Sequence, residues 1–192
     1  MITAIPFPQH VIESGGAKAE GLISISGHGY PQPVFDAAHY SNRVLRLVFD
    51  DIPAAEWTDH NGKDWIGPTE AQIEEVLAFT AAIDRDSRWG GTIAVHCLHG
   101  QSRSFALAVA INAQSRGPGQ ELAAVTAALR GSAIASRKSM DEVLENLSGN
   151  PGIIRAADRL LQRSGAIEAA MDHSVPRFRS WKTYWQRNGC LV

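Results

Sequence analysis

The most informative pattern in the chain is an apolar run that passes through a short polar loop into a second apolar run. Residues 93–95 are apolar and mostly β-branched, and they end in His96-Cys97. Five residues later, Arg103-Ser104 opens the stretch 105–111, which is apolar on every side of a helix. The pattern predicts a strand over Thr92–His96, a tight loop and a buried central helix.

Two further apolar runs lie upstream and read as strands, Gly21–Ser26 and Val44–Phe49. Between them and the loop, Thr69 and Gln72 form a capping box that predicts a helix start. That helix connects through residues 84–91 to the strand before the loop. Its predicted buried face comprises Ile73, Val76, Leu77, Thr80 and Ile83.

Helical segments also follow the loop. The central helix is expected to stop before Gly117, and a second helix covers 120–129. A third begins near Ser139, with Glu142 completing a capping box, and a fourth runs from Asn150-Pro151 to Gly165. Helix, parallel strand and loop in this order predict an α/β fold. We expect a central, mostly parallel twisted sheet flanked by helices in three α/β/α layers.

The composition is that of an ordinary globular protein. The chain has 192 residues, of which 44% are hydrophobic and 20% charged, as in ordinary globular proteins. We therefore expect a single domain over 1–192. The net charge of −2 gives no general case for nucleic acid or an anionic membrane as partner. No apolar run is long enough to span a bilayer, and the first sixteen residues do not resemble a signal peptide.

Cysteine and histidine usage favours metal-free chemistry in a reducing compartment. Cys97 and Cys190 are the only two cysteines, which is too few for a disulfide framework. The seven histidines are scattered, without the spacing of metal ligands. We therefore expect a cytoplasmic protein that uses neither a metal nor another cofactor.

The loop between Cys97 and Arg103 has the chemistry of an anion site. Backbone N–H groups of a tight turn and of a helix start converge on an anion, and the helix dipole adds positive charge. Arg103 can direct two N–H groups onto two phosphate oxygens. The same positive field favours the thiolate form of Cys97.

The segment His96-Cys97-Leu98-His99-Gly100-Gln101-Ser102-Arg103-Ser104 resembles the signature loop of the cysteine-dependent protein tyrosine phosphatases. It is closest to the small dual-specificity branch and its bacterial relatives, and the similarity in layout covers about residues 20–165.

The resemblance implies a role for each loop residue. Cys97 would be the nucleophile, Arg103 the phosphate ligand, Ser104 the hydroxyl that assists thiolate release, and His96 a support for the loop. Gly100 would supply permissive backbone angles or a close approach to the substrate oxygens. The remaining phosphate-binding N–H groups would come from Leu98, His99, Gln101 and Ser102. His99 and Gln101 depart from the commonest pattern, and we interpret His99 as a rim residue.

The family also uses an aspartic acid that protonates the leaving oxygen. The strand 44–49 ends in Asp50-Asp51, and alignment on the strand end favours Asp51, with Asp50 as the alternative. Both aspartates could instead be polar residues of a turn. An insertion from Pro53 to Pro68, with turn signals, separates this position from the loop.

The implied activity is hydrolysis of phosphotyrosine through a cysteinyl-phosphate, with phosphoserine, phosphothreonine and other aryl phosphates as further substrates. The partner would then be a phosphorylated protein or a small aryl phosphate, and phosphate, sulfate or vanadate should occupy the loop. A non-catalytic phosphate-binding module on the same fold is the main alternative. A rhodanese-like sulfurtransferase is a weaker one, because such loops are usually shorter.

The last residues, 166–192, read as a basic, aromatic tail, with both side-chain types interleaved over Val175–Arg187. Such a strip can bind nucleic acid, clamp an acidic or phosphorylated partner, or mediate dimerisation. We favour a plainer interpretation, in which the aromatic rings pack on the domain and the arginines face water.

Overall fold

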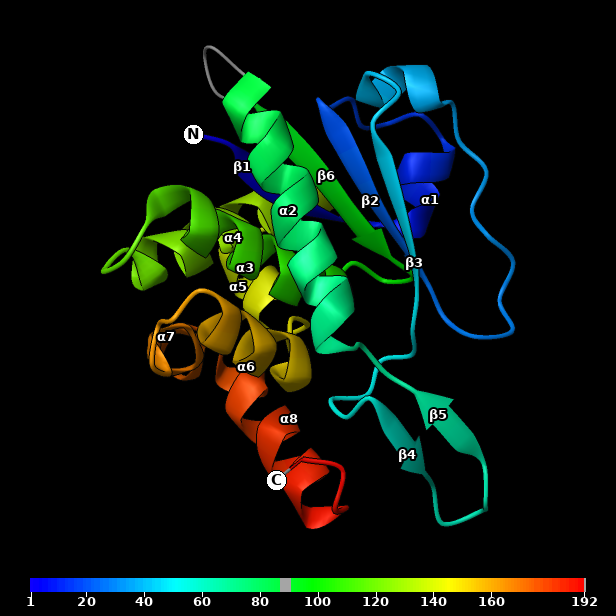
Figure 1. Cartoon of the computed structure of the whole chain (residues 1–192), viewed down its shortest axis with the longest axis vertical. Helices are drawn as coiled ribbons and strands as arrows, with labels where there is room; N and C mark the ends of the chain where they lie inside the picture. Colours follow the sequence, from blue (N-terminus) through cyan, green and yellow to red (C-terminus); the bar gives the residue numbers. More distant parts are fainter. Residues whose placement is uncertain (87–90, 192) are drawn as a thin grey trace.

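The computed structural model describes residues 1–86 and 91–191 and has a parallel sheet at its centre (Figure 1). Its four strands are β1 (Thr3–Pro8), β2 (Gly21–Ser26), β3 (Val44–Val48) and β6 (Thr92–Cys97). They pair in the order β1-β6-β2-β3, every pair parallel. All carboxyl ends therefore meet at one edge, where open α/β sheets bind ligands.

Helices cover both faces of this sheet. On one face, Leu22 and Ala94 pack against Ile12 of α1 (Gln9–Glu13) and Tyr40 of the short helix η1 (Ala37–Tyr40). The neighbouring strand residues point the other way, into the main core beneath the larger helices. This alternation is what a sheet buried on both sides requires. The predicted α/β fold with three layers is confirmed.

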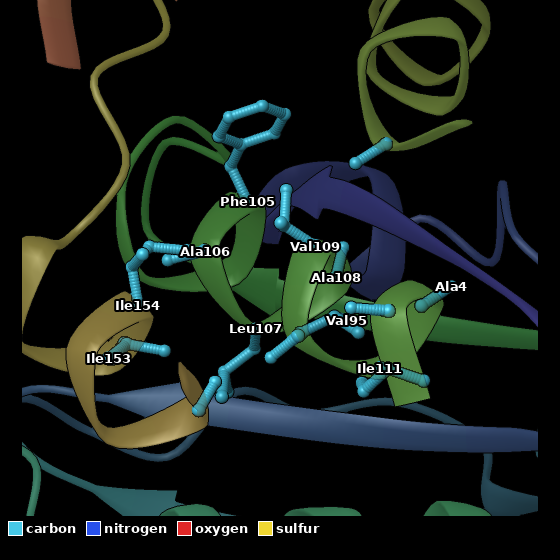
Figure 2. Close-up of a cluster of buried hydrophobic side chains, with 14 of the residues drawn as sticks. Ala4, Val95, Phe105, Ala106, Leu107, Ala108, Val109, Ile111, Ile153 and Ile154 are labelled. Atoms are coloured by element: carbon cyan, nitrogen blue, oxygen red, sulfur yellow. The ribbon is translucent and has the colours of Figure 1, made fainter. Parts of the chain in front are cut away.

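The main core is organised around α3 (Arg103–Arg116) (Figure 2). Every residue from Arg103 to Ala113 is buried. The surrounding elements are α2 (Glu70–Asp86), α4 (Glu121–Ser136) and α6 (Pro151–Leu160), together with the sheet. A helix buried on all sides has little freedom to tilt or slide, so the position of its first turn is fixed.

Most helices and strands of the structure lie where the sequence predicts them. Strand β2 has the predicted bounds, whereas β3 ends one residue earlier and β6 one residue later than predicted. The two capping boxes and the Asn150 cap are present. Helix α4 continues to Ser136 instead of stopping at residue 129, and α6 ends at Leu160, short of Gly165. Part of the predicted connection 84–91, residues 87–90, lies outside the described residues.

Strand β1 has no counterpart in the sequence prediction, because Pro6 and Pro8 argue against a strand. Proline is tolerated at the edge of a sheet, which is where β1 lies. A side chain pairs with backbone groups at the free edge of β1. Asn112 of α3 accepts a hydrogen bond from the Ala4 N–H (2.9 Å) and donates one to the Ala4 carbonyl (3.1 Å).

The insertion 53–68 and the tail are both folded. The insertion forms an antiparallel hairpin of β4 (Glu56–Thr58) and β5 (Asp64–Ile66). The tail forms α7 (Ala166–Ser174) and α8 (Pro176–Arg187), after the short α5 (Met140–Leu144) earlier in the chain. Within the ranges described, no helix combines the length and the apolar character that crossing a bilayer needs.

The hairpin and α8 meet through tryptophans. The Trp57 and Trp185 rings lie edge to face, with centroids 5.6 Å apart, and Trp181 packs on Trp185 at 5.2 Å. Ile52, directly after the candidate acid, belongs to the same cluster. Aromatic rings in this arrangement contribute more than their buried area alone. The prediction that tail aromatics pack on the rest of the chain is confirmed.

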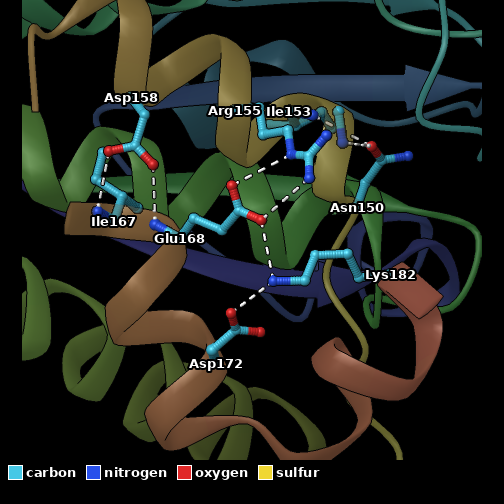
Figure 3. A network of polar contacts seen from close by, with 9 residues as sticks. Asn150, Ile153, Arg155, Asp158, Ile167, Glu168, Asp172 and Lys182 are labelled. Carbon is cyan, nitrogen blue, oxygen red and sulfur yellow. Dashed lines mark hydrogen bonds and ion pairs between the residues drawn. The ribbon is translucent and has the colours of Figure 1, made fainter. Parts of the chain in front are cut away.

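A partly buried ionic network links α8 to α7 and α6 (Figure 3). Lys182 of α8 pairs with Glu168 (3.0 Å) and Asp172 (2.5 Å) of α7, and Arg155 of α6 also reaches Glu168. Burial opposes the charge on Glu168, but the hydrogen bonds from Lys182 and Arg155 still hold its pKa below the ordinary value. Burial likewise opposes the charge on Lys182, and its hydrogen bonds to Asp172 and Glu168 raise its pKa. Both shifts favour the charged forms of Glu168 and Lys182 near neutral pH.

We predict that Asn112→Ala lowers the free energy of unfolding by about 2–4 kcal/mol, because it leaves the buried Ala4 N–H and carbonyl without partners. Urea unfolding followed by circular dichroism measures the change. Thr126→Ala, on the exposed side of α4, is the control and should change stability by less than about 0.5 kcal/mol. An Asn112→Ala protein as stable as the control would show that the two hydrogen bonds do not hold β1.

Candidate active site

The loop 98–102 joins the end of β6 to the start of α3, so Cys97 and Arg103 stand at its two ends. Cys97 is 3% exposed, and its Sγ lies 3.2 Å from the Ser104 Oγ. The fold therefore brings the candidate nucleophile and the candidate hydroxyl into hydrogen-bond contact. Both are held by regular structure, a strand on one side and a buried helix on the other.

The backbone of the loop is oriented with its carbonyls outward. The Leu98 carbonyl accepts from the Gln9 N–H (3.3 Å), and the Gln101 carbonyl accepts from the N–H groups of Ser148 (3.2 Å) and Gly149 (3.3 Å). By contrast, the N–H groups of residues 99–105 find no acceptor among the residues that the structure describes. A run of unpaired N–H groups that ends in a helix start is an anion-binding arrangement.

Gly100 is required by its surroundings as well as by its backbone angles. Its φ is +74°, in the left-handed region that favours glycine. A Cβ at this position would lie 2.7 Å from the Pro8 nitrogen and 2.8 Å from the Phe7 carbonyl carbon. The loop therefore rests directly on the end of β1, the strand that the sequence prediction missed.

Arg103 is fixed by one bond and left free along one edge. Its Nη1 donates to the Phe49 carbonyl at 2.8 Å, while its buried Nε has no protein partner among the described residues. A guanidinium anchored in this way keeps the Nε edge available for two parallel bonds to an anion. The anchor also joins the loop to the chain just before the two aspartates.

The two aspartates have different surroundings. The Asp50 carboxylate is 7% exposed and accepts hydrogen bonds from the N–H groups of His28 (3.0 Å) and Ile66 (3.1 Å). It therefore links the loop after β2 to the end of β5. The Asp51 Oδ1 instead accepts from the Ser102 hydroxyl at 2.8 Å, and Asp51 lines the same pocket as Cys97. Of the two, Asp51 has the placement that a proton donor to the loop needs.

Asn150 and Gly152 position Asp51, and sequence reasoning did not assign either of them to the site. The buried Asn150 side chain donates to Asp51 Oδ1 (3.1 Å) and to the Ile52 carbonyl (3.0 Å), while its own oxygen caps α6. A Cβ on Gly152 would collide with the main chain of Pro53. The Asn-Pro pair marked a helix start, but no sequence pattern indicated that this helix start would support an aspartate.

His96 lies behind the loop, as the predicted support would. Its ring is fully buried and its Nε2 is 2.8 Å from the Ser24 Oγ. Burial lowers the pKa of His96 to about 4, so the imidazole is neutral at physiological pH. The side chain therefore adds no positive charge beneath the loop 98–102.

The candidate nucleophile, arginine and aspartate line one pocket of about 330 Å³. Cys97, Arg103, Ser102 and Asp51 line it together with two loop residues, His99 and Gln101. Leu98 and Gly100 do not line it, so their contribution to anion binding would be limited to the backbone. The remaining lining residues come from the segment before α6 and from α8: Asn146, Ser148, Arg177, Ser180, Trp181 and Tyr184.

The tail thus does more than the sequence indicated. Phe178 and Trp185 are buried and the arginines of α8 are exposed, as the packing interpretation predicts. The contribution of α8 to the Cys97 pocket was not predicted. Separately, within residues 1–86 and 91–191, no group of three or more His, Cys, Asp or Glu side chains is arranged to hold a metal ion.

Comparison with known proteins gives matches only to solved structures; no protein-family model and no curated protein matches the chain. Human DUSP28 matches with a TM-score of 0.49 and 19% identity over 89% of this chain and 95% of that one. The active form of Tk-PTP has a TM-score of 0.47 and 16% identity over 83% and 90%. PTPMT1, in a complex with PI(5)P, has a TM-score of 0.48 and 16% identity over the same shares. Likeness at this level assigns this chain no activity, substrate or partner.

We predict that His96 makes the protein less stable in acid. Because its folded pKa, about 4, is below the ordinary value of 6.5, the unfolded state binds the proton more readily between these limits. Stability should therefore fall as pH drops through this range, by roughly 2 kcal/mol between pH 7 and pH 5 from this group.

The measurement is urea unfolding at both pH values for the wild type and His96→Gln. The variant should lose most of this His96-dependent difference, whereas His60→Gln, at an exposed histidine, should retain it. Equal pH dependence in wild type and His96→Gln would contradict a neutral buried imidazole.

Proposed function

We propose that the chain is a cysteine-dependent phosphomonoesterase that hydrolyses phosphotyrosine or other aryl phosphates. The observation that carries the proposal is the set of unpaired N–H groups from 99 to 105, with the Cys97 thiol and the free edge of Arg103 beside them. These groups together match a tetrahedral dianion next to a nucleophile.

In the first step, the Cys97 thiolate attacks phosphorus in line with the leaving oxygen. A sulfur–phosphorus bond forms and the bond from phosphorus to the ester oxygen breaks. Arg103 and the loop N–H groups hold the three equatorial oxygens, where negative charge is concentrated in the transition state. Asp51 gives its proton to the departing oxygen, so the alcohol or phenol leaves neutral.

In the second step, water attacks the cysteinyl-phosphate. Asp51, now a carboxylate, takes a proton from that water, and the phosphorus–sulfur bond breaks to give inorganic phosphate and the thiolate. The Ser104 hydroxyl donates a hydrogen bond to the departing sulfur, a role supported by the 3.2 Å between its Oγ and Sγ. The phosphoryl group is thus transferred first to the Cys97 sulfur and then to water, with Asp51 moving the proton in each step.

We predict that Cys97→Ser abolishes turnover of p-nitrophenyl phosphate in the presence of a chelator, because the serine hydroxyl is not ionised at neutral pH. Asp51→Asn should lower kcat by about 10²–10³ and remove the fall in rate on the alkaline side, where the acid loses its proton. The measurement is kcat against pH for both variants and the wild type.

Asp50→Asn is the matched control for the Asp51 variant. It alters a neighbouring carboxylate that bonds to backbone N–H groups, so the shape of the pH profile should remain that of the wild type. A wild type that binds vanadate tightly but turns over no phosphomonoester would instead indicate a phosphate-binding module.

We further predict that Arg103→Lys lowers kcat/KM by at least about 10²-fold. Lysine cannot keep the bond to the Phe49 carbonyl and also present two parallel donors to the phosphate. Steady-state kinetics with p-nitrophenyl phosphate test this, together with vanadate inhibition, which should weaken in parallel. Unchanged vanadate affinity would place the anion away from Arg103.

A further inference from the structure

Helix α8 contributes two aromatic rings and a cation to the pocket that the phosphate loop also lines. The rings of Trp181 and Tyr184 are stacked, with centroids 5.3 Å apart and an interplanar angle of 6°. Both line the pocket that contains Cys97, and so does Arg177 one turn earlier on the helix. None of these three residues has a part in the two chemical steps described above.

The aromatic pair is held rigidly. Trp185 contacts both rings edge to face, at 5.2 Å from Trp181 and 5.1 Å from Tyr184, and Trp185 itself packs on Trp57 of the hairpin. On the other side, Lys182 fixes α8 to α7 through its two carboxylate partners (Figure 3). Tyr184 nevertheless remains 48% exposed. A fixed and exposed ring in a pocket wall can pack against a ligand at little entropic cost.

Arg177 is a cation without a carboxylate partner. Its Nη1 donates to the Glu145 carbonyl at 2.7 Å, and it forms no ion pair with a described residue. That single bond fixes the direction of the guanidinium and leaves its charge uncompensated. The phosphate itself is already matched by Arg103 and the loop, so Arg177 is suited to a second negative charge on the same ligand.

We propose that α8 is the substrate-recognition element of this site. Its Trp181–Tyr184 pair packs against the ring of an aromatic phosphomonoester, and Arg177 binds a second anionic group of that molecule, as an acidic residue beside phosphotyrosine provides. The inference rests on the proposed function, because it takes the phosphate to lie over Cys97. A neighbouring groove lined by Tyr30 and Trp65 shares Asp51 and Arg103 with the α8 pocket, but only the α8 pocket includes Cys97.

Recognition is tested without turnover, by measuring peptide affinity in the Cys97→Ser protein through fluorescence anisotropy. Three labelled peptides are compared: phosphotyrosine with acidic neighbours, phosphotyrosine with neutral neighbours, and phosphothreonine with acidic neighbours. The acidic phosphotyrosine peptide should bind most tightly. Arg177→Gln should weaken it by about fivefold and leave the neutral peptide unchanged. Tyr184→Ala should weaken both phosphotyrosine peptides by about fivefold and the phosphothreonine peptide little, while Tyr184→Phe restores affinity.

Two exposed residues of the same helix provide matched controls. Arg179 bonds to the Asp172 carbonyl and does not line the pocket, so Arg179→Gln should have no effect on any peptide. Gln186→Ala should behave in the same way. A small-molecule arm compares phenyl phosphate with 4-carboxyphenyl phosphate. Arg177 dependence in the peptides alone places the second charge on a neighbouring residue, and dependence in both arms shows that a charge on the ring suffices.

The outcomes separate this inference from the proposed function. If wild-type protein hydrolyses p-nitrophenyl phosphate but Arg177→Gln weakens acidic and neutral peptides equally, or not at all, the role of α8 is wrong and the phosphatase stands. If the wild type neither hydrolyses phosphomonoesters nor binds vanadate, both are wrong. Vanadate affinity in the Cys97-containing protein should be the same with and without the Arg177 and Tyr184 substitutions, because vanadate has no ring and no second anionic group.

Discussion

The burial of α3 is the constraint on which the rest of the structure depends. Because apolar residues surround this helix on all sides, its axis and its first turn are fixed by packing against the sheet, α2, α4 and α6. The loop before it is then pinned at several points: to β1 through Gly100, to the start of α1 through Gln9, and to the segment before α6 through the Gln101 carbonyl. What remains unbonded is a set of N–H groups, and the fold places the thiol and the guanidinium next to them.

Much of this arrangement follows from local sequence. The strand, loop and helix around Cys97 are predicted by a change from a β-branched run to an apolar helix, and the three caps at Thr69, Ser139 and Asn150 are read from side chains that bond to nearby backbone. These signals are reliable because partner and target lie within a few residues of each other. The burial of α3 could likewise be predicted locally, because residues 105–111 are apolar on every side of the helix.

The missing elements all depend on contacts between distant segments. Strand β1 is stabilised by pairing with β6 and by Asn112, more than a hundred residues away. Its two prolines argue against a strand in the sequence. The difference between Asp50 and Asp51 likewise depends on Ser102 and Asn150, which only the folded chain brings near. The position of α8 beside the pocket requires the hairpin, because the insertion and the tail each supply half of one tryptophan cluster. Neither the insertion nor the tail, read alone in the sequence, indicates that the two segments pack together.

The support of Asp51 has a consequence for how the pocket responds to a ligand. Its loop is bonded to Ser102 and Asn150, and at Gly152 it lies so close to α6 that no side chain fits between them. These contacts within the protein are enough to hold Asp51 beside the loop. The entropy cost of ordering this segment is then met during folding, and positioning Asp51 adds little to the cost of binding a ligand.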